Sequence, residues 1–138
     1  MRRRALAVLV TVPLVLAVAA SARPRAPRTV RIVAACNPSE NPRVEPESRS
    51  MARQDHVEWQ EQTGRATAWM ITPKDRERWP FADTIRGSQE TPAATGLPVT
   101  TGLLASARDS VHLQYDVTIT CQDGRTQHID PEIVIGPN

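Results

Sequence analysis

Two cysteines and three histidines are the side chains of this sequence best suited to metal or redox chemistry. Cys121 and His128 are a closely spaced cysteine and histidine, with six residues between them. A soft metal such as copper needs three or four convergent ligands, so this pair forms a site only with a further ligand. A metal-binding or electron-transfer site at Cys121 and His128 is therefore the alternative hypothesis. His56, His112 and His128 are each expected on a polar strand face or in a turn, as solvated groups.

The cysteines Cys36 and Cys121 allow a second kind of chemistry. Each falls on the apolar side of an alternating segment, so both are expected to point into a core. In an oxidising compartment such a pair persists as a disulfide, which stabilises a domain by about 2–4 kcal/mol. We therefore predict a disulfide between Cys36 and Cys121. Two buried thiols and a pair of metal ligands are the alternatives.

Catalytic constellations do not appear in the sequence. No Gly-x-Ser-x-Gly elbow, glycine-rich phosphate loop or Cys-x-x-Cys motif occurs. The acidic residues Glu58 and Glu61 lie in a stretch that we expect to be solvated rather than in a cleft. We predict no catalytic residues and no enzyme activity.

Trp59, Trp69 and Trp79 supply most of the aromatic bulk, beside one tyrosine and one phenylalanine. A buried indole removes a large apolar area from water, so core packing is the expected role of all three. A surface row that stacks on sugars is the alternative.

Strands are the elements that must position these residues. Between Val111 and Cys121, apolar side chains alternate with polar ones without a break. Successive side chains of a strand point to opposite faces, so this stretch predicts one long, half-buried strand. Cys121 ends it on the apolar side.

The segments around this strand contain turn signals. After it, Asp123-Gly124 predicts a hairpin turn, because glycine accepts a positive φ there. A return strand ends near Ile135 and is interrupted at Pro131, which cannot donate a ladder hydrogen bond. Before it, residues 86–110 are rich in Thr, Pro, Gly, Ala and Ser, and predict a long crossing with one or two short strands around 97–105.

Further strands are predicted at residues 29–36, 47–51, 55–59 and 65–72, separated by proline and glycine turns. The last of these has apolar residues on both faces, so we expect it to be central and covered on both sides. Short alternating strands of this kind predict an all-β domain, an antiparallel Greek-key β-sandwich that spans residues 29–138.

Residues 1–22 have the pattern of a secretory signal peptide. Three arginines precede an apolar run over residues 5–20, and small residues at 20–22 suit cleavage. The run is shorter than the ~20 apolar residues of a membrane span; an uncleaved anchor is the alternative. Residues 23–28 predict an extended Arg/Pro arm. We expect an exported protein, periplasmic or extracellular, without a membrane span after cleavage.

Charge is unevenly distributed along the chain. Three of the 17 basic side chains, and none of the 15 acidic ones, lie in residues 1–22. Four further arginines lie in residues 23–31, so the remainder of the chain is acidic. Nucleic-acid affinity rests largely on Lys and Arg contacts to phosphates, so nucleic acid is not an expected partner.

Two segments carry a resemblance to a known family. Pro42-Arg43-Val44 followed by Asp55-His56-Val57-Glu58-Trp59 resembles the early strands of the cupredoxin superfamily, which includes plastocyanin and azurin, with their Asp-x-Val-x-Trp pattern. The segment from Tyr115 through Cys121 to Ile135 resembles that family's penultimate strand, metal loop and closing strand. The resemblance spans most of residues 29–136 and implies a cupredoxin-like β-sandwich. Immunoglobulin-like sandwiches are the structural rival.

The resemblance also implies a copper site made of two histidines, a cysteine and an axial methionine. No histidine occurs between residues 57 and 111, and no methionine follows Met70. Only Cys121 and His128 match the late cysteine and histidine, so a copper-binding or electron-transfer site at this pair is the alternative that the resemblance implies. We therefore predict a domain that has neither the copper site nor another cofactor. The sequence does not predict an oligomeric state. It would act as a non-catalytic interaction or structural module for a protein or cell-envelope component.

Overall fold

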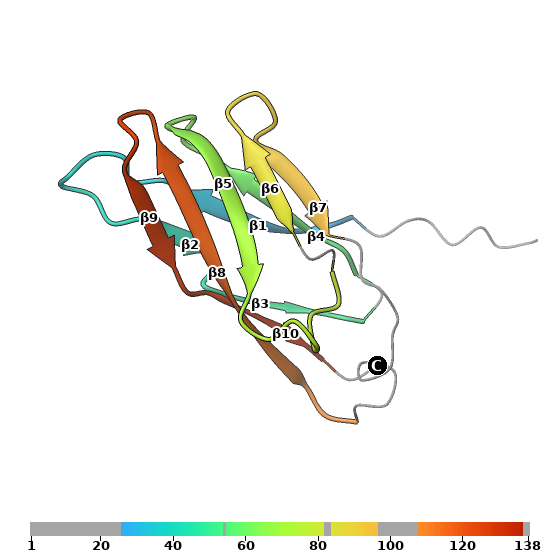
Figure 1. The fold of residues 1–138 in the computed structure, drawn as a ribbon. Helices are drawn as coiled ribbons and strands as arrows, with labels where there is room; N and C mark the ends of the chain where they lie inside the picture. Colours follow the sequence, from blue (N-terminus) through green and yellow to red (C-terminus); the bar gives the residue numbers. More distant parts are fainter. Residues whose placement is uncertain (1–25, 54, 82–83, 97–107, 137–138) are drawn as a thin grey trace, which may run out of the picture.

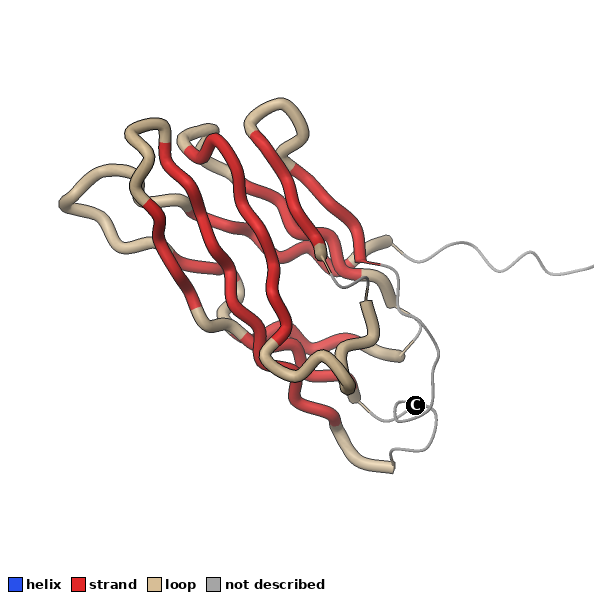
Figure 2. Tube along the Cα trace, in the orientation of Figure 1, coloured by secondary structure: helices blue, strands red, loops and turns tan. Residues whose placement is uncertain are grey.

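A computed structural model describes residues 26–53, 55–81, 84–96 and 108–136, and within them the chain forms strands and no helix. The strands lie in two layers (Figure 1), and the tube view shows the same arrangement (Figure 2). The prediction of an all-β, two-sheet sandwich is confirmed at this level. The strands are β1 (Arg28–Val33), β2 (Arg43–Glu45), β3 (Ser48–Met51), β4 (Val57–Glu61), β5 (Ala66–Pro73), β6 (Ile85–Ser88), β7 (Ala93–Gly96), β8 (Val111–Cys121), β9 (Thr126–Ile129) and β10 (Glu132–Ile135).

Parts of the prediction fall outside the described residues. These are the signal peptide at 1–22, the first three residues of the arm, and the whole of the 97–105 stretch. The last residue of the predicted arm, Arg28, already belongs to β1.

The two sheets are mixed, so the predicted purely antiparallel arrangement is wrong. The smaller sheet has the order β2-β1-β4-β7, and the larger one has the order β3-β10-β8-β5-β6 with β9 also paired to β8. Strand β1 runs parallel to β4, and β3 runs parallel to β10. The order of the strands explains the parallel pair in the smaller sheet. Strand β2 runs antiparallel to β1, and β3 then crosses to the other sheet, so β4 returns to the smaller sheet running in the same direction as β1.

Strand β8 is the central element of the larger sheet, and its bounds are the predicted ones. Its side chains alternate between buried and more exposed positions over the whole length. Strand β5 pairs along one side of β8, while β10 and β9 share the other side. The return strand is therefore present in two pieces, and the break between them contains Pro131, which has no amide to donate.

Two corners join the sheets. At one corner, β2 belongs to the smaller sheet and β3, which follows after a short connection, belongs to the larger sheet. At the other, β6 pairs with β5 and β7 pairs with β4. Strands β6 and β7 thus lie in and just before the region for which the sequence predicted a long crossing.

Glycines explain why the sequence did not reveal the β6–β7 corner. A Cβ atom on Gly87 would lie 2.4 Å from the Trp69 indole, and one on Gly96 would lie 2.8 Å from that of Trp59. Rings from neighbouring strands fill the space that apolar side chains of β6 and β7 would otherwise occupy. Glycine is a turn signal in the sequence, whereas here it permits close packing.

One face of β5 is exposed, contrary to the expectation that both are covered. The strand lies between β8 and β6, so its internal place in the sheet is the expected one. Ala68 and Met70 nevertheless face solvent, and Met70 is 40% exposed. A register shift between Ala66 and Ala68 places both Ala66 and Trp69 on the buried side. The bulge therefore explains why Ala66 is buried although it alternates in step with Ala68 and Met70, which are exposed.

Aromatic rings fill the core between the sheets. Trp59 packs edge-on against Phe81 and Tyr115, with ring centroids 5.5 Å and 6.0 Å away. The Trp59 indole N–H donates a hydrogen bond to the Tyr115 hydroxyl at 3.2 Å. Trp69 and Trp79 are buried as well. The predicted core role of the three tryptophans is confirmed, and they form no surface row that could stack on sugars.

Tyr115 gives a direct optical test of this core, because it is the only tyrosine in the chain. Burial raises its pKa to about 12, against about 10 in an unfolded chain. Since the pKa of Tyr115 is higher in the folded state, the protonated Tyr115 contributes to stability. This stabilisation is fully present below about pH 10 and is lost as the pH rises towards 12.

The absorbance of the phenolate is therefore expected to rise with a midpoint near pH 12 in the native protein. The same titration in concentrated guanidinium should give a midpoint near 10. A native midpoint near 10, in protein whose tryptophan fluorescence still shows the folded state, would contradict the burial of Tyr115.

Candidate functional site

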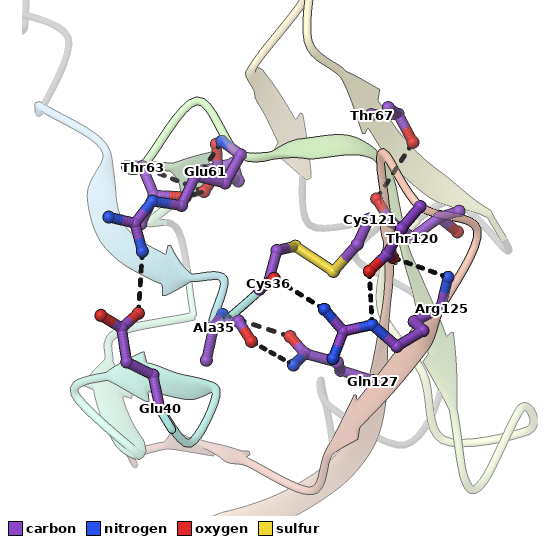
Figure 3. The surroundings of a disulfide bond; sticks show 12 residues. Ala35, Cys36, Glu40, Glu61, Thr63, Thr67, Thr120, Cys121, Arg125 and Gln127 are labelled. Atoms are coloured by element: carbon purple, nitrogen blue, oxygen red, sulfur yellow. Dashed lines mark hydrogen bonds and ion pairs between the residues drawn. A yellow bond between two sulfur atoms is a disulfide. The ribbon is translucent and has the colours of Figure 1, made fainter. Parts of the chain in front are cut away.

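The disulfide between Cys36 and Cys121 joins the two sheets at one end of the sandwich (Figure 3). Cys36 follows β1 of the smaller sheet, and Cys121 is the last residue of β8 in the larger sheet. Their Cα atoms lie 5.6 Å apart. The predicted disulfide is confirmed, in place of the alternative of two free thiols. Cys121 is buried as expected, whereas Cys36 is partly exposed.

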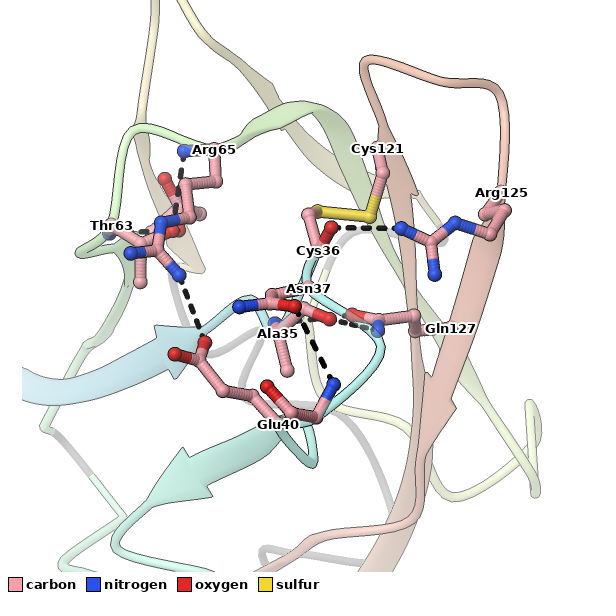
Figure 4. Close-up of polar contacts among 11 residues, drawn as sticks. Ala35, Cys36, Asn37, Glu40, Thr63, Arg65, Cys121, Arg125 and Gln127 are labelled. Carbon is pink, nitrogen blue, oxygen red and sulfur yellow. Dashed lines mark hydrogen bonds and ion pairs between the residues drawn. A yellow bond between two sulfur atoms is a disulfide. The ribbon is translucent and has the colours of Figure 1, made fainter.

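Gln127 of β9 binds the segment next to Cys36 (Figure 4). Its side-chain oxygen accepts a hydrogen bond from the Ala35 amide at 3.2 Å, and its side-chain nitrogen donates to the Ala35 carbonyl at 2.5 Å. A neighbouring strand would satisfy a residue through the same two backbone groups. The Gln127 amide thus replaces one step of a strand ladder between β9 and the end of β1.

Arg125 binds the same segment from the β8–β9 turn. One terminal nitrogen of its guanidinium donates to the Cys36 carbonyl at 2.8 Å, and its Nε donates to the Asp123 carboxylate at 2.5 Å. The Arg125 backbone amide, and then its guanidinium, hold the pKa of Asp123 below the usual range. Gly124 has a φ of 81°, so the predicted Asp-Gly turn is present.

Glu61 organises the turn on the other side of the disulfide. Its side chain is buried, with 6% exposure, and its carboxylate accepts hydrogen bonds from the amides of Thr63 at 2.8 Å and Gly64 at 2.7 Å. The expectation that Glu58 and Glu61 lie in a solvated stretch is therefore wrong for Glu61. The turn amides and the Thr63 hydroxyl offset the cost of burying its charge.

A depression of about 390 Å³ opens beside the disulfide, and both cysteines contribute to its lining. Of its charged lining residues, Arg65 is paired with Glu40 at 2.8 Å, and Asp123 is paired with Arg125. The charges around the disulfide are thus already neutralised. The chemistry that this site offers is thiol–disulfide exchange with an external thiol, and its structural role is to hold the sheets together.

The structure does not bring Cys121 and His128 together as metal ligands. The Cys121 sulfur is bonded to Cys36, and His128 pairs with Thr118 on the opposite face of the sheet, with its Nδ1 3.3 Å from the Thr118 hydroxyl. The described residues contain no group of three or more His, Cys, Asp or Glu side chains arranged to hold a metal. These side chains do not fit the copper site that the family resemblance implies.

The other two histidines also lie apart from the disulfide. His112 is exposed, and its Nδ1 lies 3.2 Å from the Glu132 carboxylate, which in turn accepts a hydrogen bond from Ser48. His56 is partly exposed immediately before β4. The expectation that His112 is a solvated surface group agrees with its position.

Lys74, Asp116 and Asp130 form an ionic cluster that the sequence did not single out. The Lys74 ammonium lies 3.1 Å from Asp130 and 3.6 Å from Asp116. A hydrogen bond between the two carboxyl groups raises the pKa of Asp116 and lowers that of Asp130. All three side chains are solvent-exposed, so the cluster is a surface ion-pair network rather than a catalytic cleft.

Compared with known protein families, curated proteins and solved structures, the chain matches none. The described part of the chain contains no helix that could cross a membrane. Any functional assignment therefore rests on the sequence and geometry of this chain alone.

The disulfide is expected to contribute strongly to stability, since it closes a loop with a sequence separation of 85. Replacing both residues, Cys36→Ser with Cys121→Ser, should lower the free energy of unfolding by about 2–4 kcal/mol. Urea unfolding followed by tryptophan fluorescence measures this difference. Reductant should lower the midpoint of the native protein to that of the variant and leave the variant unchanged. Equal midpoints for the oxidised protein and the variant would contradict the role assigned to the disulfide.

Proposed function

We propose that this chain is an exported, non-catalytic module that binds or supports a partner in the periplasm or outside the cell. The observation that carries the proposal is the Cys36–Cys121 disulfide, because disulfides persist in oxidising compartments and are rare in the cytosol. Residues 1–22 are proposed to be the signal peptide that directs this export.

The buried carboxylates are bonded to backbone amides or an arginine, and this supports a non-catalytic role. Asp55 is buried and binds Arg28 at 3.1 Å and the Ala52 amide at 3.0 Å. Glu61 binds the amides of its own turn. Catalytic acids and bases need a cleft that leaves them accessible to substrate. Here both carboxylates hold backbone segments in place instead.

We further propose that the domain is a cupredoxin-like, Greek-key sandwich whose copper site has been replaced by a structural disulfide. Support comes from Trp59, which is buried at the end of the Asp-x-Val-x-Trp pattern, and from Cys121, the residue that matches the family's cysteine ligand. In this chain that sulfur is bonded to Cys36. The same position therefore contributes to stability rather than to electron transfer.

The proposed partner is a protein or a cell-envelope component rather than nucleic acid. The chain beyond residue 31 has more acidic than basic side chains, which disfavours a surface that tracks phosphates. A pre-formed, disulfide-bonded sandwich binds a partner with little loss of conformational entropy.

Export is tested by expressing the full chain and separating the exported and cytoplasmic fractions. The protein is expected in the exported fraction, with Arg23 as its first residue by mass spectrometry and with no thiol available to an alkylating reagent before reduction. A matched chain without residues 2–22 should stay in the cytoplasm with two reactive thiols. Intact leader and reactive thiols in the protein from the full chain would contradict the proposal.

The binding role is tested in the same exported fraction by cross-linking at native concentration. A reproducible cross-linked partner is expected for the oxidised protein, and it should be lost for the Cys36→Ser, Cys121→Ser variant at a temperature where that variant is unfolded. A protein that forms no adduct with any component of the envelope or medium would contradict a partner-binding role.

A further inference from the structure

Arg49 is a charged side chain on the inner face of the larger sheet. In the β3–β10 pairing it stands beside Ile133, which is fully buried and points into the core. One terminal nitrogen of its guanidinium donates to the Thr29 carbonyl of β1, in the smaller sheet. Arg49 therefore spans the seam between the two sheets, near the start of β1.

The charge of Arg49 is not neutralised by the described residues. None of their carboxylates lies within ion-pair distance of its guanidinium, and its Nε is buried without a hydrogen-bond partner. A guanidinium carries five N–H donors, and burial of such a group is costly unless an anion or several acceptors compensate it. Within the described chain, the Thr29 carbonyl is the hydrogen-bond acceptor that it has.

An open depression of about 420 Å³ lies at this seam, lined by Thr29, Arg31, Glu45, Pro46 and Arg49. Its single carboxylate, that of Glu45, already accepts a hydrogen bond from Arg43 at 2.6 Å. Arg31 stands opposite Glu45 in the β1–β2 pairing. Two arginines therefore line this depression, and its one acidic lining residue, Glu45, is already paired with Arg43. The excess of positive charge is expected to attract anions.

We propose that this depression is a binding site for a small oxyanion, held by Arg49 on the inner side and by Arg31 at the surface. The planar guanidinium presents paired donors that match two oxygens of a carboxylate or a phosphate. An oxyanion there compensates the partly buried charge of Arg49, which has no carboxylate partner among the described residues. This site is independent of the proposed export and partner binding.

The test uses nuclear magnetic resonance on the folded, oxidised protein at constant ionic strength. Inorganic phosphate and acetate are titrated separately, with chloride as the balancing anion, and the Arg49 Nε–H and Thr29 amide signals are followed. A saturable shift with phosphate, with acetate or with both is expected, and the anion that saturates at lower concentration identifies the preferred oxyanion. Shifts that stay linear, or that chloride alone reproduces, would overturn the proposal.

Variants separate this site from general surface attraction. Arg49→Gln should weaken the affinity about tenfold or more, since a hydrogen bond to a charged group contributes about 1.5–3 kcal/mol. Arg31→Gln, at an exposed position, keeps the test decisive if the Arg49 variant fails to fold, and should also weaken binding. Arg86→Gln on β6 is the matched control and should leave the affinity unchanged. Unchanged affinity in every foldable variant at positions 31 and 49 would overturn the proposal.

Discussion

The covalent link between Cys36 and Cys121 is the constraint on which one whole end of this molecule depends. It fastens the segment after β1 to the last residue of β8, and these strands belong to different sheets. Gln127 and Arg125 bind the backbone of the same segment from β9 and its preceding turn. At this end, side chains therefore join the layers. Elsewhere the layers are joined by the β2–β3 and β6–β7 corners and by the aromatic core around Trp59.

The sequence predicted features that depend on local pattern. Period-two alternation defined β8 and placed Cys121 on its inner face, and the Asp-Gly pair located the hairpin that follows. Pairing direction was not predictable, because alternation reports which face is buried and not which neighbour lies beside it. Strands β6 and β7 were missed since their glycines fit under tryptophan rings from other strands. The parts played by Glu61, Gln127 and Arg49 depend on contacts that only the folded chain creates.

These findings give a consistent account of how the chain uses its few reactive groups. The two sulfur atoms form the disulfide that stabilises the domain. The buried carboxylates bind turns and the start of β1. The histidines lie apart from one another and from the disulfide. The exception is Arg49, whose charge lies at the seam without a carboxylate partner among the described residues.

Amide hydrogen exchange on the oxidised and the reduced protein tests the central claim most directly. The Ala35 amide donates a hydrogen bond to Gln127 beside the disulfide. The Tyr115 amide donates to the Pro131 carbonyl at 3.2 Å, six residues before Cys121 on β8 and so farther from the disulfide. If the disulfide holds this end of the sandwich, reduction should remove protection first and most strongly at Ala35, with Tyr115 still protected. Unchanged protection at Ala35, or an equal loss at both amides, would contradict the account.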